Sequence, residues 1–296
     1  MKILITGKKS YIGNQIKKWI KNKSDYEISR ISLRDDQWKA LDFSGYDAVI
    51  HLAGIVHKKD REVPLEEYFA VNRDLTKAIA IKAKAEGVTQ FIYLSSMAVY
   101  GERGNLNQRV VITSETKESP NTPYGQSKFE GEKALRAMES NKFKVAILRP
   151  PMIYGKECPG NYARLRKIAL RWGVYPNMHN QRSMLYIDNL MMMIKGILDQ
   201  KLQGTFFPQD EEYSDTLEMI KEIRKAHDKK TWVLNLVRPL MFLAGKKSST
   251  MNKAFGNLCY DKCLSIIKEV EYQKVGMKEG INRIENESVQ YKPPGK

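Results

Sequence analysis

The sequence predicts an α/β protein with a doubly wound parallel sheet and a smaller C-terminal substrate lobe. Short apolar runs alternate with helical patterns, a glycine turn separates the first run from the first helix, and a tyrosine-lysine pair follows a run that ends in serine. Buried runs that alternate with helices are typical of a parallel sheet covered on both faces. Ligands of such sheets bind at the carboxyl ends of the strands.

The expected elements follow from these patterns. Short apolar runs are interpreted as buried strands at 2–6, 26–33, 46–54, 91–96 and 144–150. Helical patterns lie between and after them, at 11–21, 64–86, 124–140, 161–172, 188–200 and 214–227. The 12 residues 34–45 leave little room for the additional strand and helix that are common in such sheets.

We expect two interlocked domains. The cofactor-binding domain is expected to span 1–155, with 184–204 as a further part of it. The pattern loosens after PPMIYG, so 156–183 and 205–284 are assigned to a substrate-binding lobe. The polar end, 285–296, is expected to be frayed.

Composition narrows the class of protein. A chain of 296 residues can bury a full hydrophobic core. No apolar run approaches the roughly 20 residues of a membrane span, and MKILITGKKS has the pattern of a strand rather than a signal peptide, so a cytoplasmic protein is expected. The cysteines Cys158, Cys259 and Cys263 are too scattered for a disulfide framework, and the four histidines lack metal-ligand spacing, so we expect no metal site.

The formal net charge of +16 suggests nucleic-acid binding as one hypothesis. The lysines are spread along the whole chain, however, without the aromatic interleaving of an RNA-binding sheet, and no nucleic-acid partner is expected. An anionic substrate or an acidic membrane surface explains the charge more simply. Residues 229–253 place WVLNLV and PLMFLAG between lysines and could lie on a membrane surface, although a pair of core helices in the smaller lobe is favoured.

A phosphate-binding turn is predicted in TGKKSYIG, residues 6–13. Gly7 and Gly13 allow a tight turn whose backbone N–H groups, with the N-terminus of the next helix, face a pyrophosphate. Glycine usually occupies the middle position, and Ser10 there would shift the cofactor outward or add a hydroxyl contact. The other candidate cofactor contacts of the turn are Lys9, Tyr11 and Ile12.

The end of the second predicted strand bears on the choice of cofactor. Enzymes that use NAD usually hold the ribose 2′-hydroxyl with an acidic residue there. Here Ser32 and Arg34 come first, and an arginine, helped by Lys8 or Lys9, would pair with the 2′-phosphate of NADP. NADP is therefore favoured, and the alternative is a solvated Arg34 with Asp35 serving NAD.

The most informative pair is Tyr124 and Lys128, one helical turn apart in PYGQSKFEGEKAL. The two share a helix face, so the lysine ammonium can lie near the phenol and lower its pKa from about 10. A tyrosine poised in this way is a general acid or base. Such a pair is usually an exposed helix face in a lysine-rich chain, but of fifteen tyrosines only Tyr124 has a lysine four residues later.

The motifs also occur in a recognisable order. TGKKSYIG, HLAG at 51–54, Asn72, SSMAVYG at 95–101, the Tyr124–Lys128 pair and RPPMIYG at 149–155 follow one another as in the extended short-chain dehydrogenases/reductases, which the chain resembles from residue 1 to about 227. The resemblance implies a Rossmann domain and NAD(P)-dependent chemistry. It is strongest to bacterial capsule and O-antigen (lipopolysaccharide) enzymes that act on UDP-N-acetylhexosamine derivatives.

The resemblance implies roles for individual residues. Tyr124 would be the acid or base, Lys128 would bind the nicotinamide ribose, and Ser96 would hydrogen-bond the reacting oxygen. Further positions matched to the family are Leu52, Ala53 and Gly54 as cofactor contacts, Asn161 and Arg182 as substrate contacts, Ser95 as a structural or cofactor contact, and Asn72 near the active site or in helix packing.

Two reactions remain open. The family's sugar 4,6-dehydratases carry Asp-Glu after the serine or threonine, where this chain has Met97 and Ala98, so dehydration is not expected. A 4-ketoreductase would reduce a UDP-4-keto-6-deoxy-N-acetylhexosamine to UDP-N-acetylquinovosamine or UDP-N-acetylfucosamine, whereas a UDP-N-acetylglucosamine or UDP-glucose 4-epimerase would oxidise and re-reduce its substrate with bound NAD. Arg34 favours the reductase with NADPH. The family also implies a homodimer through helices 64–86 and 124–140.

Overall fold

The computed structural model describes residues 1–20, 25–56, 64–102, 104–235, 252 and 255–286. The chain forms two compact units. The first comprises Met1–Gly101, Lys117–Pro150 and Met191–Phe207, and the second comprises Glu102–Thr116, Pro151–Leu190 and Pro208–Lys296. The first domain, expected over 1–155, is interrupted at 102–116 because β5 (Val110–Ile112) pairs with β12 (Leu258–Tyr260) in the second unit.

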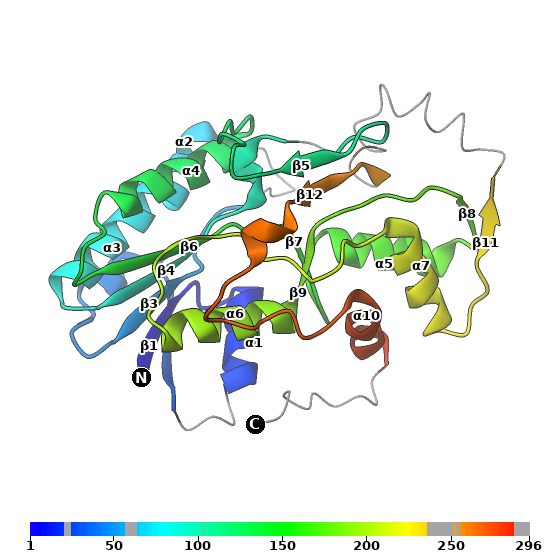
Figure 1. Ribbon diagram of the computed structural model, residues 1–296. Helices are drawn as coiled ribbons and strands as arrows, with labels where there is room; N and C mark the ends of the chain where they lie inside the picture. The colour runs from blue at the N-terminus through cyan, green and yellow to red at the C-terminus, as the bar shows by residue number, and fades with distance from the viewer. Residues whose placement is uncertain (21–24, 57–63, 103, 236–251, 253–254, 287–296) are drawn as a thin grey trace. The chain divides into compact units, whose positions relative to one another are not determined.

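A six-stranded parallel sheet forms the centre of the first unit, in the order β10-β6-β4-β3-β1-β2 (Figure 1). Its strands are β1 (Lys2–Thr6), β2 (Glu27–Ile31), β3 (Ala48–His51), β4 (Gln90–Leu94), β6 (Lys144–Leu148) and β10 (Gly204–Phe206). Between β2 and β3 the chain forms only the 3-10 helix η1 (Asp36–Lys39), so β3 lies directly beside β1. The predicted doubly wound parallel fold is therefore confirmed.

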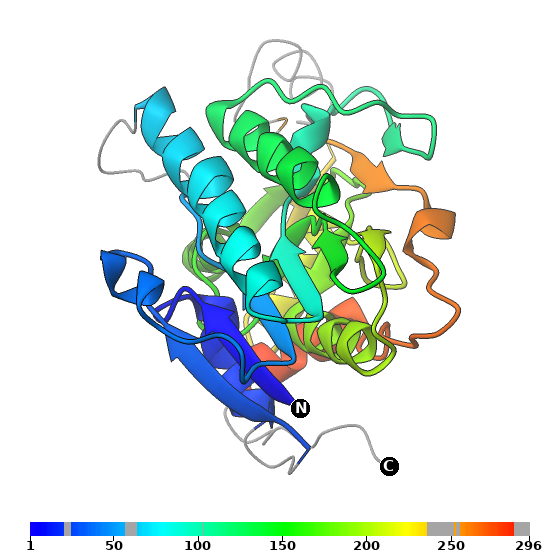
Figure 2. The same ribbon diagram turned by 90° about the vertical axis from the view of Figure 1, so that its left-hand side faces the viewer.

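Helices cover both faces of this sheet (Figures 1 and 2). One face carries α1 (Tyr11–Ile20) and α6 (Ile187–Asp199), and the other carries α2 (Leu65–Phe69), α3 (Thr76–Ala85) and α4 (Pro123–Arg136). A π-helical segment, η2 (Ala70–Leu75), joins α2 to α3, so the helix predicted at 64–86 is continuous but locally widened. Thr122 caps α4 by accepting from the N–H of Gly125 at 3.1 Å, which starts the helix immediately before Tyr124.

The second unit is built from helices and pairs of three-residue strands. Besides β5 and β12, β7 (Met152–Tyr154) pairs with β9 (Met184–Tyr186), and β8 (Val174–Pro176) pairs with β11 (Trp232–Leu234). Among its described residues, the longer helices are α5 (Asn161–Arg171), α7 (Thr216–Lys225) and α10 (Met277–Glu285). The favoured pair of core helices at 229–253 is wrong for 232–234, which form β11, and 236–251 and 253 lie outside the described residues.

Within the described residues, no helix has both the length and the apolar character needed to cross a membrane.

Candidate active site

The turn between β1 and α1 places its glycines where side chains do not fit. Gly7 has a φ of +82°, and a Cβ on it would lie 3.1 Å from the backbone nitrogen of Ala53. A Cβ on Gly13 would lie 2.7 Å from the Oγ of Ser10. The turn is therefore packed directly against the Leu52–Ala53 backbone that follows β3, which brings two predicted cofactor segments together.

Ser10 is used by the helix itself. Its backbone N–H donates to the carbonyl of Gly7 at 2.8 Å, and its Oγ accepts from the N–H of Gly13 at 3.1 Å. A serine in this position satisfies one of the unpaired N–H groups of the first helical turn. The departure from glycine in the motif thus provides the N-cap of α1. The neighbouring candidates differ in exposure, since Lys9 is exposed whereas Tyr11 and Ile12 are half-buried.

The charged residues of β2 and of the segment after it have different contacts. Arg34 is exposed, and the carboxylate of Asp35 accepts from the N–H of Gln37 at 3.3 Å, so Asp35 caps η1. The arginine that contacts the phosphate turn is Arg30, which donates to the carbonyl of Lys8. Sequence reasoning missed Arg30 because it lies inside the strand and has no motif around it.

Gly54, Asn72 and Lys128 come together after β3. A Cβ on Gly54 would lie 3.0 Å from Asn72 Oδ1 and 3.1 Å from Lys128 Nζ. The Asn72 amide donates to the carbonyl of Ile55 and to Ser127 Oγ, both at 3.0 Å, and its Oδ1 accepts from the N–H of Ile55 at 2.9 Å. Asn72 therefore ties the segment after β3 to α4 and fixes the helix that carries Lys128.

Lys128 is buried, with 4% of its surface exposed. Its Nζ donates to the carbonyl of Leu94 at 2.9 Å and lies 4.6 Å from the ring centroid of Tyr93. Burial lowers the pKa of Lys128 to about 8, and the nearby Glu132 carboxylate opposes that effect. The ammonium form therefore persists at neutral pH although little water reaches it.

Tyr124 lies beside Ser96. Burial raises the pKa of the Tyr124 phenol, and a hydrogen bond with Ser96 acts in the opposite direction. The sequence predicts instead that Lys128 lowers this pKa, which is not observed because burial dominates and the ammonium is engaged by Leu94. Ser96 Oγ accepts from the N–H of Ala98 at 3.1 Å, as the N-cap of the 3-10 helix η3 (Met97–Tyr100), and its own hydroxyl hydrogen faces Tyr124.

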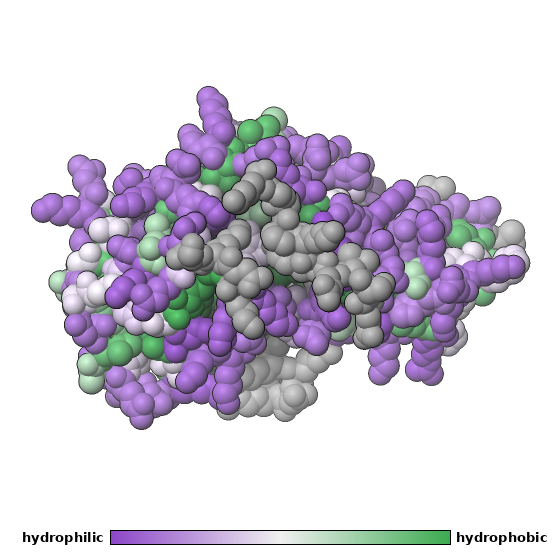
Figure 3. Space-filling model, turned by 90° about the horizontal axis from the view of Figure 1, so that it is seen from below, coloured by the Kyte–Doolittle hydropathy of each residue, from purple (hydrophilic) through white to green (hydrophobic). Residues whose placement is uncertain are grey.

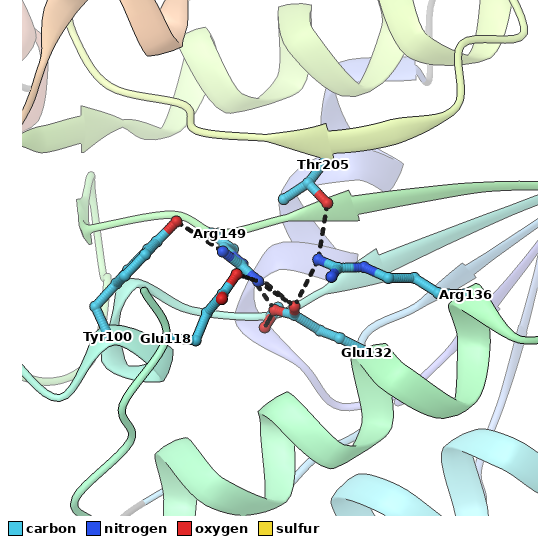
Figure 4. A network of polar contacts seen from close by, with 7 residues as sticks. Tyr100, Glu118, Glu132, Arg136, Arg149 and Thr205 are labelled. Carbon is cyan, nitrogen blue, oxygen red and sulfur yellow. Dashed lines mark hydrogen bonds and ion pairs between the residues drawn. The ribbon is translucent and has the colours of Figure 1, made fainter. Parts of the chain in front are cut away.

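Ser95 instead contacts a buried ionic network. Figure 4 shows Glu132, Arg149, Tyr100 and Glu118 of this network. The Ser95 hydroxyl donates to the carboxylate of Glu132, which is 0% exposed and pairs with the guanidinium of Arg149 at 2.6 Å. Arg149 also donates to Tyr100 Oη and contacts Glu118 Oε1, both at 2.7 Å. No sequence motif pointed to Glu132, although it follows Lys128 by one helical turn on α4.

The predicted substrate contacts belong to the second unit. Asn161 is exposed and begins α5. The backbone of Arg182 exchanges hydrogen bonds with Ser214 at 3.0 and 2.9 Å, and burial lowers the pKa of its guanidinium. The structure thus brings Tyr124 and Ser96 together in the first unit and places Asn161 and Arg182 in separate elements of the second.

The parallel sheet, the glycine turn and the tyrosine-lysine helix agree with a match to the model of the NAD dependent epimerase/dehydratase family over residues 3–205. The chain belongs to this family. This membership confirms the family predicted from the motif order.

Several proteins are similar to this member of the epimerase/dehydratase family over most of its length. UDP-glucose 4-epimerase of Vibrio cholerae is 30% identical, covering 88% of this chain and 87% of that protein. The N-acetyl-alpha-D-glucosaminyl-diphospho-ditrans,octacis-undecaprenol 4-epimerase of Escherichia coli O157:H7 is 27% identical, covering 86% and 81%. The fold matches UDP-glucuronic acid 4-epimerase of Bacillus cereus in complex with NAD, with a TM-score of 0.72 at 21% identity over 96% and 97% of the two chains. The activity is therefore of the sugar-nucleotide 4-epimerase, dehydratase or reductase type.

Proposed function

We propose that this protein is a 4-epimerase that inverts the C4 hydroxyl of UDP-glucose or UDP-N-acetylglucosamine with bound NAD. The observation that carries the proposal is the pairing of Tyr124 with Ser96 beside a buried Lys128, in a chain whose 30%-identical relative is a UDP-glucose 4-epimerase. The preference for a ketoreductase drawn from Arg34 is reversed, because two relatives that match along nearly their whole length are named 4-epimerases.

The turn and the adjoining strand end fit a dinucleotide. Gly7 lets the turn approach the backbone at Leu52 and Ala53 closely, Gly54 lets Lys128 Nζ approach the end of β3, and the first turn of α1 offers N–H groups to a pyrophosphate. Gly7, Ser10, Gly13 and Leu52–Gly54 would hold the cofactor, together with Lys128. A nicotinamide group held there supplies the hydride acceptor and donor for C4.

The chain's own residues supply the proton transfers. Tyr124 would take the proton of the C4 hydroxyl during oxidation and return it to the oxygen after the keto sugar has turned its other face. Ser96 would donate to that oxygen in both directions and stabilise the charge that develops on it. Lys128, as an ammonium, would bind the nicotinamide ribose. Arg182 would form two parallel hydrogen bonds with the diphosphate of the substrate, with Asn161 as a second contact.

The test is product analysis by NMR with UDP-glucose and UDP-N-acetylglucosamine as separate substrates. We expect interconversion with the corresponding galacto sugar and no net consumption of cofactor. Tyr124→Phe should lower turnover by about 10²- to 10⁴-fold, whereas Tyr46→Phe, a matched variant outside the site, should not. Undiminished turnover in Tyr124→Phe would refute the assignment. The same assay with N-acetylglucosaminyl-diphospho-undecaprenol tests whether a lipid diphosphate replaces UDP.

A second candidate is the NADPH-dependent 4-ketoreductase. The supporting observation is that Arg34 is exposed after β2 while the carboxylate of Asp35 is engaged in capping η1. The discriminating measurement is absorbance at 340 nm with UDP-4-keto-6-deoxy-N-acetylglucosamine and NADPH, run beside NADH. Stoichiometric loss of NADPH would establish the reductase, and the product NMR would then assign the quinovo or fuco configuration.

A further inference from the structure

Exposed apolar side chains gather in one part of the second unit. Of the nine large apolar side chains that are exposed among the described residues, five lie on α5, β8, β11 and the residue after α5. They are Ile168, Trp172, Val174, Trp232 and Leu234, and the two tryptophans are 59% and 65% exposed. Around β8 and β11, Figure 3 shows apolar residues in green among hydrophilic residues in purple.

The strand pairing places the exposed apolar side chains of β8 and β11 on one face. Val174 pairs with Trp232 and Pro176 with Leu234, and alternate residues of a strand share a face. Tyr175, between them, is buried on the opposite side, where its hydroxyl lies 2.9 Å from the carbonyl of Trp172. Trp172 lies two residues before Val174, between the end of α5 and β8, and its side chain is 59% exposed.

The surface is held in place by a buried arginine. Arg224 is 6% exposed, and it donates to the carbonyls of Ala169, at 2.7 Å, and Trp172 at the end of α5. It also donates to the carbonyl of Lys230 and, at 3.2 Å, to Thr231 Oγ1, directly before β11. The two exposed tryptophans are therefore carried by segments fixed to one another.

The same segments are strongly basic. Residues 161–176 and 224–235 together contain eight Lys and Arg residues and one acidic residue, Asp228. Arg166 pairs with Glu285 at 2.8 Å and Arg224 is buried. The six others are exposed: Arg164, Lys167, Arg171, Lys225, Lys229 and Lys230.

We propose that this surface, the five apolar side chains with the six exposed basic residues, docks the protein on an anionic lipid bilayer. Tryptophan favours the interface between water and hydrocarbon, and each basic residue near an anionic leaflet strengthens binding by about fivefold. A second copy of the chain is a poorer partner, because a twofold interface would bring the same basic residues face to face. The inference does not depend on which sugar reaction the site performs.

The experiment is flotation of the full-length protein with vesicles of phosphatidylcholine alone or mixed with phosphatidylglycerol. Trp19 and Trp38 are only 8% and 7% exposed, so a change in tryptophan emission on binding reports on Trp172 and Trp232. We expect binding only to anionic vesicles, with a blue shift of the emission and quenching by brominated lipid. The double variant Trp172→Ala, Trp232→Ala should lose at least tenfold in affinity.

Two further variants test the contribution of the basic residues and the specificity of the apolar contribution. Lys229→Glu with Lys230→Glu should also weaken binding, and high salt should reduce the difference from wild type. Ile266→Ala, which removes an apolar side chain 69% exposed outside this surface, should bind as wild type does. Turnover of a soluble UDP-sugar should be unchanged in all these variants, which separates this test from that of the proposed reaction. Equal binding by the tryptophan double variant, a change of oligomeric state in its place, or binding of RNA without binding of vesicles would overturn the proposal.

Discussion

At the scale of single residues, two neighbouring serines have different hydrogen-bond partners. Ser96 lies beside Tyr124, whereas Ser95 donates to the buried Glu132. The motif SSMAVYG predicts a pair of hydroxyls, and the resemblance to the family assigns Ser96 to the reacting oxygen. The partner of Ser95 could not be predicted, because Glu132 lies 37 positions away along the chain and only the packing of α4 on β4 brings the two together.

Substituting the two serines separately should separate catalysis from stability. Ser96→Ala should lower turnover by about 10- to 10³-fold with little change in the midpoint of urea unfolding, because it removes a donor to the developing oxyanion. Ser95→Ala should lower the free energy of unfolding by about 1–3 kcal/mol and affect turnover less, because it removes a hydrogen bond to a buried charge. Equal loss of turnover in both variants would contradict the division.

Removing the charge of Glu132 should show how much the Glu132–Arg149 pair contributes to stability. Glu132→Gln leaves the Arg149 guanidinium, which is 1% exposed, with Glu118 as its remaining counter-ion and should cost about 1.5–3 kcal/mol in the free energy of unfolding. Glu130→Gln is the matched control on the same helix, since Glu130 pairs with Lys133 in an exposed ion pair worth under about 1 kcal/mol. A comparable cost for both variants in urea unfolding would show that burial of the pair is unimportant.

At the scale of elements, the position of α4 depends on the absence of a side chain at Gly131. A Cβ on Gly131 would lie 2.5 Å from the carbonyl oxygen of Asn72 and 2.7 Å from Tyr93 Oη. Glycine in a helix normally costs about 1 kcal/mol relative to alanine, so propensity alone would predict that Gly131→Ala is stabilising. The close approach of α4 to η2 predicts the opposite sign.

Gly131→Ala should therefore destabilise the protein by about 1–3 kcal/mol and lower turnover, because α4 carries Tyr124 and Lys128. Gly45→Ala, where a Cβ would meet nothing within 4 Å, is the control and should be neutral or slightly stabilising. Thermal unfolding of both variants checks the sign, and stabilisation by Gly131→Ala would mean that α4 shifts without cost.

The elements that could be predicted are those with a long or repeated pattern. The buried strands of the first unit were predictable because strands that are buried on both faces of a sheet consist of continuous apolar runs. Its amphipathic helices were predictable because their apolar residues recur with a helical period. The three-residue strands β5, β8, β11 and β12 carry too few residues for a period and depend on partners far along the chain. The role of Ser10 as the N-cap of α1 was not predicted, because the motif in which it lies was interpreted only as a cofactor-binding turn.

At the scale of the whole molecule, the two units contain buried groups with opposite responses to pH. His51 lies between the hydroxyls of Thr6 and Thr76, each at 3.0 Å, and burial lowers its pKa to about 3 from an ordinary value of 6.5. Asp210 accepts from Tyr154 Oη at 2.9 Å, and burial raises its pKa to about 7 from 3.8. Shifts of about three units each correspond to roughly 4 kcal/mol.

Proton binding in the folded and unfolded states decides whether acidification raises or lowers the free energy of unfolding at each group. Between pH 6.5 and about 3 the unfolded chain binds a proton at His51 that the folded one does not, so acidification lowers the free energy of unfolding. Between about pH 7 and 3.8 the folded chain holds a proton at Asp210 that the unfolded one releases, so acidification raises it. In urea unfolding from about pH 7 to about pH 4.5, acidification should lower the free energy of unfolding less in His51→Asn than in the wild type, and more in Asp210→Asn than in the wild type. Parallel slopes in both variants would refute the assignment.

The homodimer predicted through helices 64–86 and 124–140 stays a prediction, as does the cytoplasmic location. Sedimentation equilibrium, run with the protein free of lipid, measures the first. Because the membrane-docking surface lies on α5, β8 and β11, substitutions at Trp172 and Trp232 should leave that oligomeric state unchanged.

The π-helical segment η2 also constrains how related sequences can vary in length. A π-helical turn is an α-helix with one inserted residue, and each residue of an α-helix turns the chain by about 100°. Losing one residue between 70 and 75 would therefore rotate Thr76 and all of α3 away from His51, or Asn72 away from Ile55 and Ser127. We expect alignments of proteins that share this site to carry no gap here, so that the insertion itself becomes a marker of common descent.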